Sequence, residues 1–190
     1  MKDSKKNNKF PEHLRLDHSF EKGVNYLDRV IQITGEIGED VTFDWLDAAL
    51  CELERDTKKT VTLKIFSGGG SVYDALAMVG RLKASRCHIV TEGYGAVMSA
   101  ATLLLACGNF RKISEYCQFM HHSSTYGVHG RHDEVKAEVE NAEREERLWA
   151  HWMAKFSTQD EQFWYNHGKN HNMYLSAEQV LVLGVVDAII

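Results

Sequence analysis

The chain has 190 residues and a mass of 21.6 kDa, a size that fits one domain. Hydrophobic residues make up 44% and charged residues 26%, which excludes a largely disordered chain. Lys and Arg number 22 against 27 Asp and Glu, and this net charge of -5 disfavours a nucleic-acid-binding protein, which usually carries a basic excess. Apolar runs stay well below the ~20 residues of a membrane span, and Met1–Lys9 lacks the apolar stretch of a signal peptide. We expect no membrane partner.

Beyond a polar N-terminal tail, residues 1–25, strand and helix signals alternate through a single domain, residues 26–190. Short β-branched runs predict strands, and apolar residues at helical spacing predict helices. The expected elements are a strand over Val30–Thr34 that Gly35 ends, a helix over Phe43–Leu53, a strand over Val61–Phe66 that stops at a glycine cluster, a helix over Tyr73–Leu82, a strand over Cys87–Thr91, a helix over Ala100–Ala106 and a strand over Gln118–His121. This order predicts an α/β fold with mostly parallel strands.

A long amphipathic segment follows at Asp133–Phe156, where apolar residues recur near the helical period. Bulky aromatic residues gather near its end, and they pack either in the core or against another subunit. Thr158-x-x-Glu161 and Ser176-x-x-Gln179 both fit a capping box, in which a side chain binds the first free N–H groups of a helix. We therefore expect a long helix and two further helices.

The four cysteines form no C-x-x-C pair, and three of them lie in apolar stretches. They are Cys51, Cys87, Cys107 and Cys117. Buried, reduced thiols are favoured over a disulfide framework, as expected for a cytoplasmic protein.

A glycine-rich segment, Ser67–Val72, lies between an expected strand and an expected helix. Successive glycines let backbone N–H groups point at an anion without interference from a Cβ atom. The segment is neither G-x-G-x-x-G nor a P-loop, because it lacks the P-loop lysine. It predicts either an oxyanion or phosphate cradle or a simple tight turn.

Ser99 also joins an expected strand to an expected helix. A serine at a helix start has the N–H of the next residue close by, which suits a nucleophile, and a helix-capping role is the alternative. His121 and His122 end a strand, and adjacent strand residues point to opposite faces, so one of them can face a given site. Other ligands at metal-binding spacing are missing from the sequence, which disfavours a metal site.

These elements, in this order, resemble the proteolytic subunit of the Clp protease, the ClpP family of serine peptidases, including its divergent or phage-encoded members. Each segment alone is a weak signal, whereas their common order is a strong one. The matching segments are Ser67–Val72 with the family's Ser-Pro-Gly-Gly-Ser-Val, Ser99–Gly108 with Ser-Met-Gly-Ala-Phe-Leu-Leu-Ala-Ala-Gly, Gln118–His122 with Arg-x-Met-Ile-His, Gly127–Gly130 with Gly-Phe-Gln-Gly, Asn172–Val180 with Asp-x-Phe-Leu-Ser-Ala-x-Glu-Ala, and the closing Leu183–Ile189.

The resemblance implies catalytic roles for Ser99 as nucleophile, His122 as general base and Asn172 as the third member of the triad. It also implies an oxyanion hole made by the backbone N–H groups of Gly70 and Ala100, with no cofactor and no metal. Asn172 replaces the family's aspartate, which implies weak or conditional activity unless another carboxylate reaches His122. An alternative register would put Val97 at the nucleophile and imply an inactive protein.

The implied fold is ClpP/crotonase-like, with repeated β-β-α units, a mostly parallel sheet and a protruding long helix. The implied function is a serine endopeptidase that cuts unfolded polypeptides inside a homo-oligomer of stacked heptameric rings, fed by an AAA+ Clp ATPase. In that family, the strand equivalent to Gly127–Gly130 lines the substrate path and joins the rings. An inactive assembly subunit and a crotonase-like acyl-CoA enzyme remain alternatives.

Overall fold

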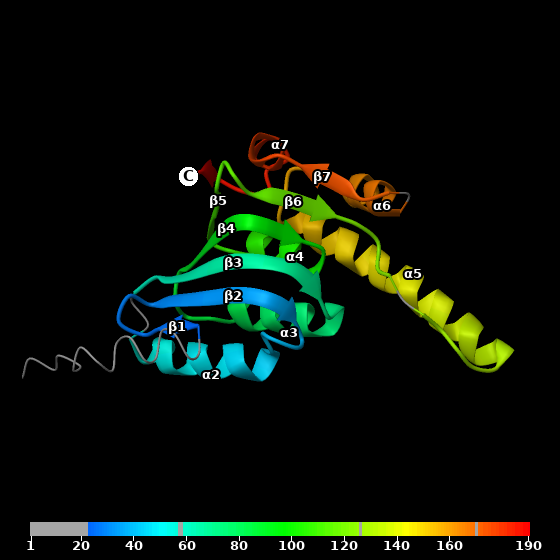
Figure 1. Cartoon of the computed structure of the whole chain (residues 1–190), viewed down its shortest axis with the longest axis horizontal. Coiled ribbons are helices and arrows are strands. Elements are labelled where there is room, and N and C mark those ends of the chain that lie inside the picture. Colours follow the sequence, from blue (N-terminus) through cyan, green and yellow to red (C-terminus); the bar gives the residue numbers. More distant parts are fainter. Residues whose placement is uncertain (1–22, 57–58, 126, 170) are drawn as a thin grey trace, which may run out of the picture.

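The computed structural model describes residues 23–56, 59–125, 127–169 and 171–190, in which eight strands form one sheet (Figure 1). The strands are β1 (Val24–Asn25), β2 (Val30–Ile37), β3 (Val61–Gly70), β4 (Ile89–Met98), β5 (Phe110–Ile113), β6 (Gln118–His121), β7 (Met173–Leu175) and β8 (Ala188–Ile189). The main path runs β1-β2-β3-β4-β5-β8, while β6 pairs with β4 and with β7. All pairs are parallel except β1 with β2 and β6 with β7, which confirms the predicted mostly parallel α/β fold.

The helices of the described residues follow the sequence prediction closely. They are α2 (Phe43–Leu53), α3 (Val72–Lys83), α4 (Ala100–Ala106), α5 (His132–Lys155), α6 (Glu161–Lys169) and α7 (Ala177–Val182), with a 3-10 turn, η1, at Glu54–Asp56. The capping box at Ser176 is confirmed at the start of α7. The prediction of a capping box at Thr158 is wrong. The Thr158 hydroxyl donates to the Leu183 carbonyl, and the Phe163 N–H donates instead to the Asp160 carboxylate at 2.7 Å.

Two strands run through the glycines that were expected to end them. The strand expected over Val30–Thr34 continues past Gly35, and β3 continues through the glycine cluster because Gly70 still pairs with Ile37. A Cβ atom on Gly70 would lie 2.2 Å from the Ile37 carbonyl oxygen, so this close approach requires glycine. The prediction that the strand stops before the glycines was wrong, since the glycines here permit pairing rather than break it.

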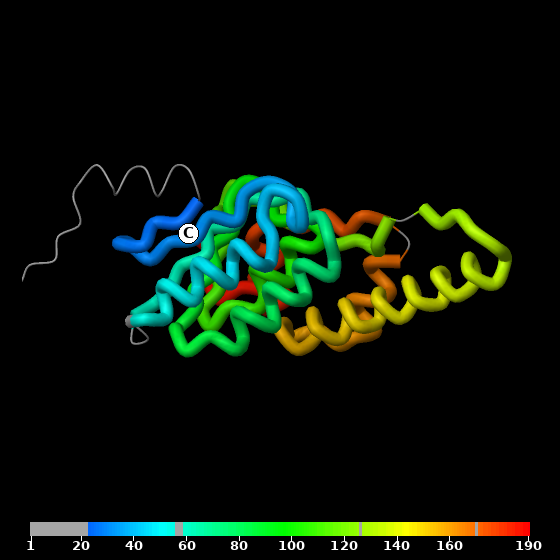
Figure 2. The backbone as a smooth tube through the Cα atoms, turned by 90° about the horizontal axis from the view of Figure 1, so that it is seen from below, coloured from blue at the N-terminus to red at the C-terminus, as the bar shows by residue number. Residues whose placement is uncertain are grey.

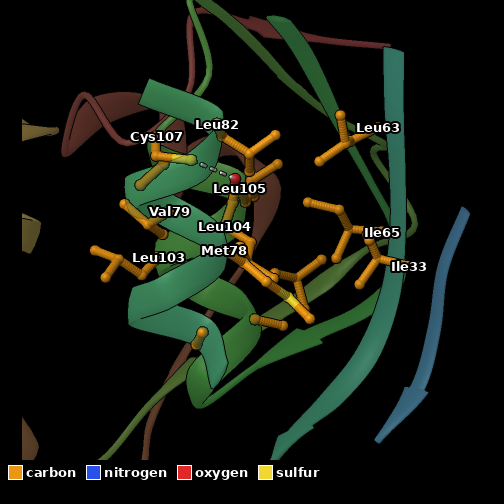
Figure 3. Packing of buried hydrophobic residues seen from close by; sticks show 14 of the residues in the cluster. Ile33, Leu63, Ile65, Met78, Val79, Leu82, Leu103, Leu104, Leu105 and Cys107 are labelled. Atoms are coloured by element: carbon orange, nitrogen blue, oxygen red, sulfur yellow. Dashed lines mark hydrogen bonds between the residues drawn. The ribbon is translucent and has the colours of Figure 1, made fainter. Parts of the chain in front are cut away.

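The hydrophobic core lies between the sheet and the helices, with α2 and α3 covering one face (Figures 1 and 2). Figure 3 shows β-sheet residues such as Ile65 facing Met78 of α3 and Leu104 of α4. Every side chain of α4 is buried. This burial on all sides holds α4, and the turn that precedes it, in one position.

The long helix α5 extends away from the sheet, as Figures 1 and 2 show, which matches the expected protruding helix. Its buried residues are Ala142, Ala150 and Met153, and the partly buried aromatic residues near its end pack against the core of the same chain. The strand expected at Gly127–Gly130 is not formed in the single chain, because a strand needs a neighbouring strand to accept its backbone hydrogen bonds.

The cysteines are free, and three of them are buried. Burial raises the pKa of Cys107 to about 12 and that of Cys117 to about 11, so both stay as neutral thiols. The expectation of buried thiols is wrong for Cys51, since α2 turns it toward solvent.

Within the described ranges no helix is long and apolar enough to cross a membrane, and no three His, Cys, Asp or Glu side chains gather at metal-binding distance. The sheet begins at Val24, inside the segment assigned to the tail, and the remaining tail residues 1–22 lie outside the described residues.

Candidate active site

Ser99 occupies a sharp turn between β4 and α4. The strand β4 begins after the expected Cys87 and runs beyond the expected end at Thr91 to Met98, directly before Ser99. The Ser99 N–H donates to the Met120 carbonyl at 2.8 Å, which ties the turn to β6. Ser99 has φ 51 and ψ -124, a conformation that costs of order 1–3 kcal/mol for a residue with a Cβ atom. A strained strand-to-helix turn of this kind is typical of a nucleophile held out from its strand.

The glycine-rich segment lies directly against Ser99. A Cβ atom on Gly69 would lie 2.6 Å from the Cβ of Ser99 and 3.0 Å from the backbone nitrogen of Ala100. The Ser67 hydroxyl donates to the Gly35 carbonyl at 2.6 Å and accepts the Gly69 N–H at 3.1 Å, which holds the segment in place. The segment is therefore part of the wall around Ser99 rather than a simple turn.

The backbone N–H groups of Gly70 and Ala100 lie next to this wall. Ser71 donates its N–H to the Ile37 carbonyl at 2.7 Å, toward β2. Successive N–H groups of a strand point to opposite edges, so the Gly70 N–H is expected to point away from β2, to the side on which Ser99 lies. Ala100 is the first residue of α4, and the N–H groups at a helix start have no partner within the helix.

Ser99 and His122 border the same pocket, called here the Ser99 pocket. Its cavity volume is about 30 Å³, and it is partly open to solvent. Its lining residues are Val72, Ser99, Ala100, His121, His122, Ser123, Ser124, Glu145, Glu146, Trp149, Trp164, Tyr165 and Gly168. His122 is half-buried, and this burial lowers its pKa below the usual 6.5.

His121 has a different environment from His122. Its side chain is 3% exposed, and its ring stands edge-on to Trp164 with the centroids 5.2 Å apart. Its Nε2 lies 3.1 Å from the Trp164 carbonyl oxygen, which can only accept, so Nε2 carries the proton. Within the described residues Nδ1 has no hydrogen-bond partner. Burial lowers the pKa of His121 to about 4, which keeps the ring neutral.

The pairing of β6 with β7 ends one residue short of His122 and of Asn172. The antiparallel pair β6 and β7 places Met120 opposite Tyr174 and His121 opposite Met173. Continuing this register by one pair places Asn172 opposite His122. Asn172 is exposed and does not line the Ser99 pocket. Val97, the alternative nucleophile position, is fully buried within β4.

The pocket also contains residues that the sequence did not single out. Glu145, Glu146 and Trp149 come from α5, and Trp164 and Tyr165 come from α6. Two adjacent glutamates on a highly charged helix form no motif, so only the packing of α5 reveals their place. The charged face of a helix is usually solvated, and here part of it borders the pocket.

Comparison with known proteins agrees with this geometry. Residues 18–190 match the family model described as Clp protease. The chain is similar to the ATP-dependent Clp protease proteolytic subunit 1 of Corynebacterium jeikeium (strain K411), with 25% identity over 166 residues, 86% of this chain and 87% of that protein. It is also similar to the ATP-dependent Clp protease proteolytic subunit of Ligilactobacillus salivarius (strain UCC118), with 25% identity over 85% of this chain and 83% of that protein. The chain, whose sheet carries a strained serine beside a histidine-lined pocket, therefore belongs to the Clp protease family.

Proposed function

We propose that this Clp protease family member is an active serine endopeptidase with Ser99 as its nucleophile. The observation that supports this best is the strained turn at Ser99, which borders one pocket together with His122. Gly69 leaves no space for a side chain against Ser99, which gives the turn a fixed wall. Both features favour a preorganised catalytic serine over a helix cap, since the Ser99 side chain caps no N–H of α4.

The Ser99 hydroxyl attacks the carbonyl carbon of the peptide bond while His122 takes its proton. His122 then gives that proton to the leaving amine, and water repeats the sequence to release the acyl group. The Gly70 and Ala100 N–H groups bind the oxyanion, and one such donor is worth about 3 kcal/mol in the transition state. The lowered pKa of His122 keeps it neutral at pH 7, as a general base must be.

Asn172 orients His122 through its side-chain carbonyl oxygen, as the strand register supports. An amide cannot stabilise the imidazolium by charge, so we expect a slower enzyme than one with aspartate at this position. The substrate is an unfolded polypeptide that lies in the adjoining groove between residues 70–73 and the segment around Gly127–His129. The working form is a cytoplasmic homo-oligomer of stacked rings fed by an AAA+ Clp ATPase, and α5 is available for contacts between subunits.

Labelling with a fluorophosphonate, which reacts with activated serines, tests this proposal. The full chain should be labelled, Ser99→Ala should lose both labelling and peptide hydrolysis, and Ser114→Ala, outside the pocket, should keep both. Light scattering of the same samples should give the mass of a ring for all three proteins. Labelling of Ser99→Ala at the unchanged rate, or absence of labelling in the wild-type oligomer, would refute the proposal.

A further inference from the structure

His122 and Asn172 lie on two chain segments that are attached to each other on both sides of these residues. On one side, the pairing of β6 with β7 ends one residue short of each. On the other side, Ser123, which directly follows His122, binds Gly168, which precedes Asn172 by four positions. The general base and its proposed partner are therefore enclosed between a strand pairing and a second attachment.

Ser123 is bound to the end of α6 by two hydrogen bonds. Its backbone N–H donates to the Gly168 carbonyl at 2.9 Å, and its hydroxyl donates to the same oxygen at 2.7 Å. The last four carbonyl groups of a helix have no partner within the helix, and Gly168 is the last residue but one of α6. Ser123 thus supplies the missing donors and fixes the helix end to the residue beside the general base.

His121, on the other side of His122, binds the same helix. Its Nε2–H donates to the Trp164 carbonyl at 3.1 Å. Gly168 makes this approach possible, because a Cβ atom there would lie 2.8 Å from that nitrogen. Both neighbours of His122 are therefore attached to α6.

The helix α6 is itself held in place. Trp164 is fully buried, and its indole N–H donates to the Ser157 hydroxyl at 2.8 Å. The helix packs along α5, and Figure 1 shows it beside the ends of β6 and β7. A helix anchored in this way provides a fixed support for the segment around His122.

We propose that Ser123 is a positioning residue, which holds His122 in reach of Ser99 by attaching its segment to the Gly168 carbonyl of α6. The inference rests on the proposed peptidase function and adds a residue to it. Ser123 acts through His122 rather than on the substrate. A general base works only within hydrogen-bond reach of the proton that it takes, and a displacement of about 1 Å can lower a rate by about 100-fold.

Removal of the Ser123 hydroxyl tests this role. Ser123→Ala keeps the backbone bond to Gly168, so we expect a partial effect, a fall in kcat of about tenfold with little change in KM. Fluorophosphonate labelling of Ser99 should slow by a similar factor, since His122 also activates the serine in that reaction. Ser123→Thr keeps a hydroxyl donor and should retain about half or more of the wild-type kcat.

The pH profile separates positioning from a loss of stability. Burial lowers the pKa of His122 below 6.5. When Ser123→Ala loosens the segment, the ring becomes more exposed, and the acidic limb of the kcat/KM profile should move up toward pH 6.5. A variant that is only less stable keeps the wild-type limb and loses amplitude.

Thr158→Val is the matched control. Thr158 donates its N–H and its hydroxyl, both at 2.9 Å, to the Leu183 carbonyl at the end of α7. This is the arrangement found at Ser123, but it lies outside the Ser99 pocket. The control should therefore keep the wild-type kcat and the wild-type acidic limb.

The outcomes separate this inference from the proposed function. Absence of labelling in the wild-type oligomer refutes the peptidase proposal itself. Normal wild-type labelling combined with an unchanged kcat in Ser123→Ala, or with a lower kcat and an unmoved acidic limb, refutes only the role of Ser123. An equal loss of kcat in Thr158→Val, or a loss in Ser123→Thr as large as in Ser123→Ala, also overturns that role.

Discussion

The buried imidazole of His121 makes the stability of this protein depend on pH. Its side chain is 3% exposed, and desolvation by burial lowers its pKa from 6.5 to about 4, with smaller effects of the same sign from His122 and His167. The hydrogen bond to the Trp164 carbonyl opposes this shift without cancelling it. Between pH 6.5 and about 4 the unfolded chain therefore binds a proton at this position that the folded chain does not.

The sign and size of the effect follow from this difference. Stability from the neutral ring is fully present above pH 6.5 and is lost as the pH falls toward 4. The gap between 6.5 and about 4 corresponds to about 3 kcal/mol of unfolding free energy. His121→Gln removes the titration, while its amide keeps a donor for the Trp164 carbonyl.

Urea unfolding at fixed subunit concentration, followed by tryptophan fluorescence at pH values from 7 to 4.5, measures this effect. The wild-type free energy of unfolding should fall by 2–3 kcal/mol more than that of His121→Gln over about two pH units. His88→Gln, which removes an exposed histidine, serves as the surface control. Parallel pH profiles for wild type and His121→Gln would show that burial of this ring does not control the acid response.

Three further predictions concern catalysis. Gly69→Ala should lower kcat/KM by about 100-fold, because a Cβ atom 2.6 Å from the Cβ of Ser99 displaces the nucleophile. Gly80→Ala, which has open space around it in α3, should leave hydrolysis intact, and equal activities of the two variants would contradict the packing argument. The acidic limb of the kcat/KM profile should lie below pH 6.5, because burial lowers the pKa of His122 and the neutral form is the base; a limb above pH 6.5 in a pH-rate series would disagree. Asn172→Asp should raise kcat with little change in KM, since the added charge stabilises the imidazolium formed in the transition state. If steady-state kinetics of the assembled variant show no gain in kcat, Asn172 is not a member of the triad.

Much of the fold is encoded in short stretches of sequence. Apolar residues at helical spacing placed α2 and α4 at their observed bounds, and α3 and α5 within one residue at each end. This works for α2, α3 and α5 because one face of each helix is buried, which gives the sequence a period of 3.6 residues, while α4 is buried on all sides and is an almost continuous apolar run. The short strands β1, β5, β7 and β8 were not predicted, since runs of two to four residues seldom show a period, although the four-residue β6 was predicted at its observed bounds.

The candidate site depended on contacts between distant segments. The order of motifs predicted Ser99 and His122 as site residues. Whether Gly69 ends a strand or packs against the nucleophile depends on its contact with residues thirty positions away. Likewise, only the pairing of β6 with β7 brings Met173, the neighbour of Asn172, opposite His121, the neighbour of His122.

The glutamates show most clearly what the sequence by itself leaves open. Glu145 and Glu146 have the same chemistry and nearly the same sequence context as their exposed neighbour Glu143. Local sequence determines that all three lie on one helix, because helical propensity and periodicity act over a few residues. Packing of α5 against α6 and α4 decides which carboxylates border the Ser99 pocket, because the direction of a side chain relative to a distant segment is set only when the whole chain has folded.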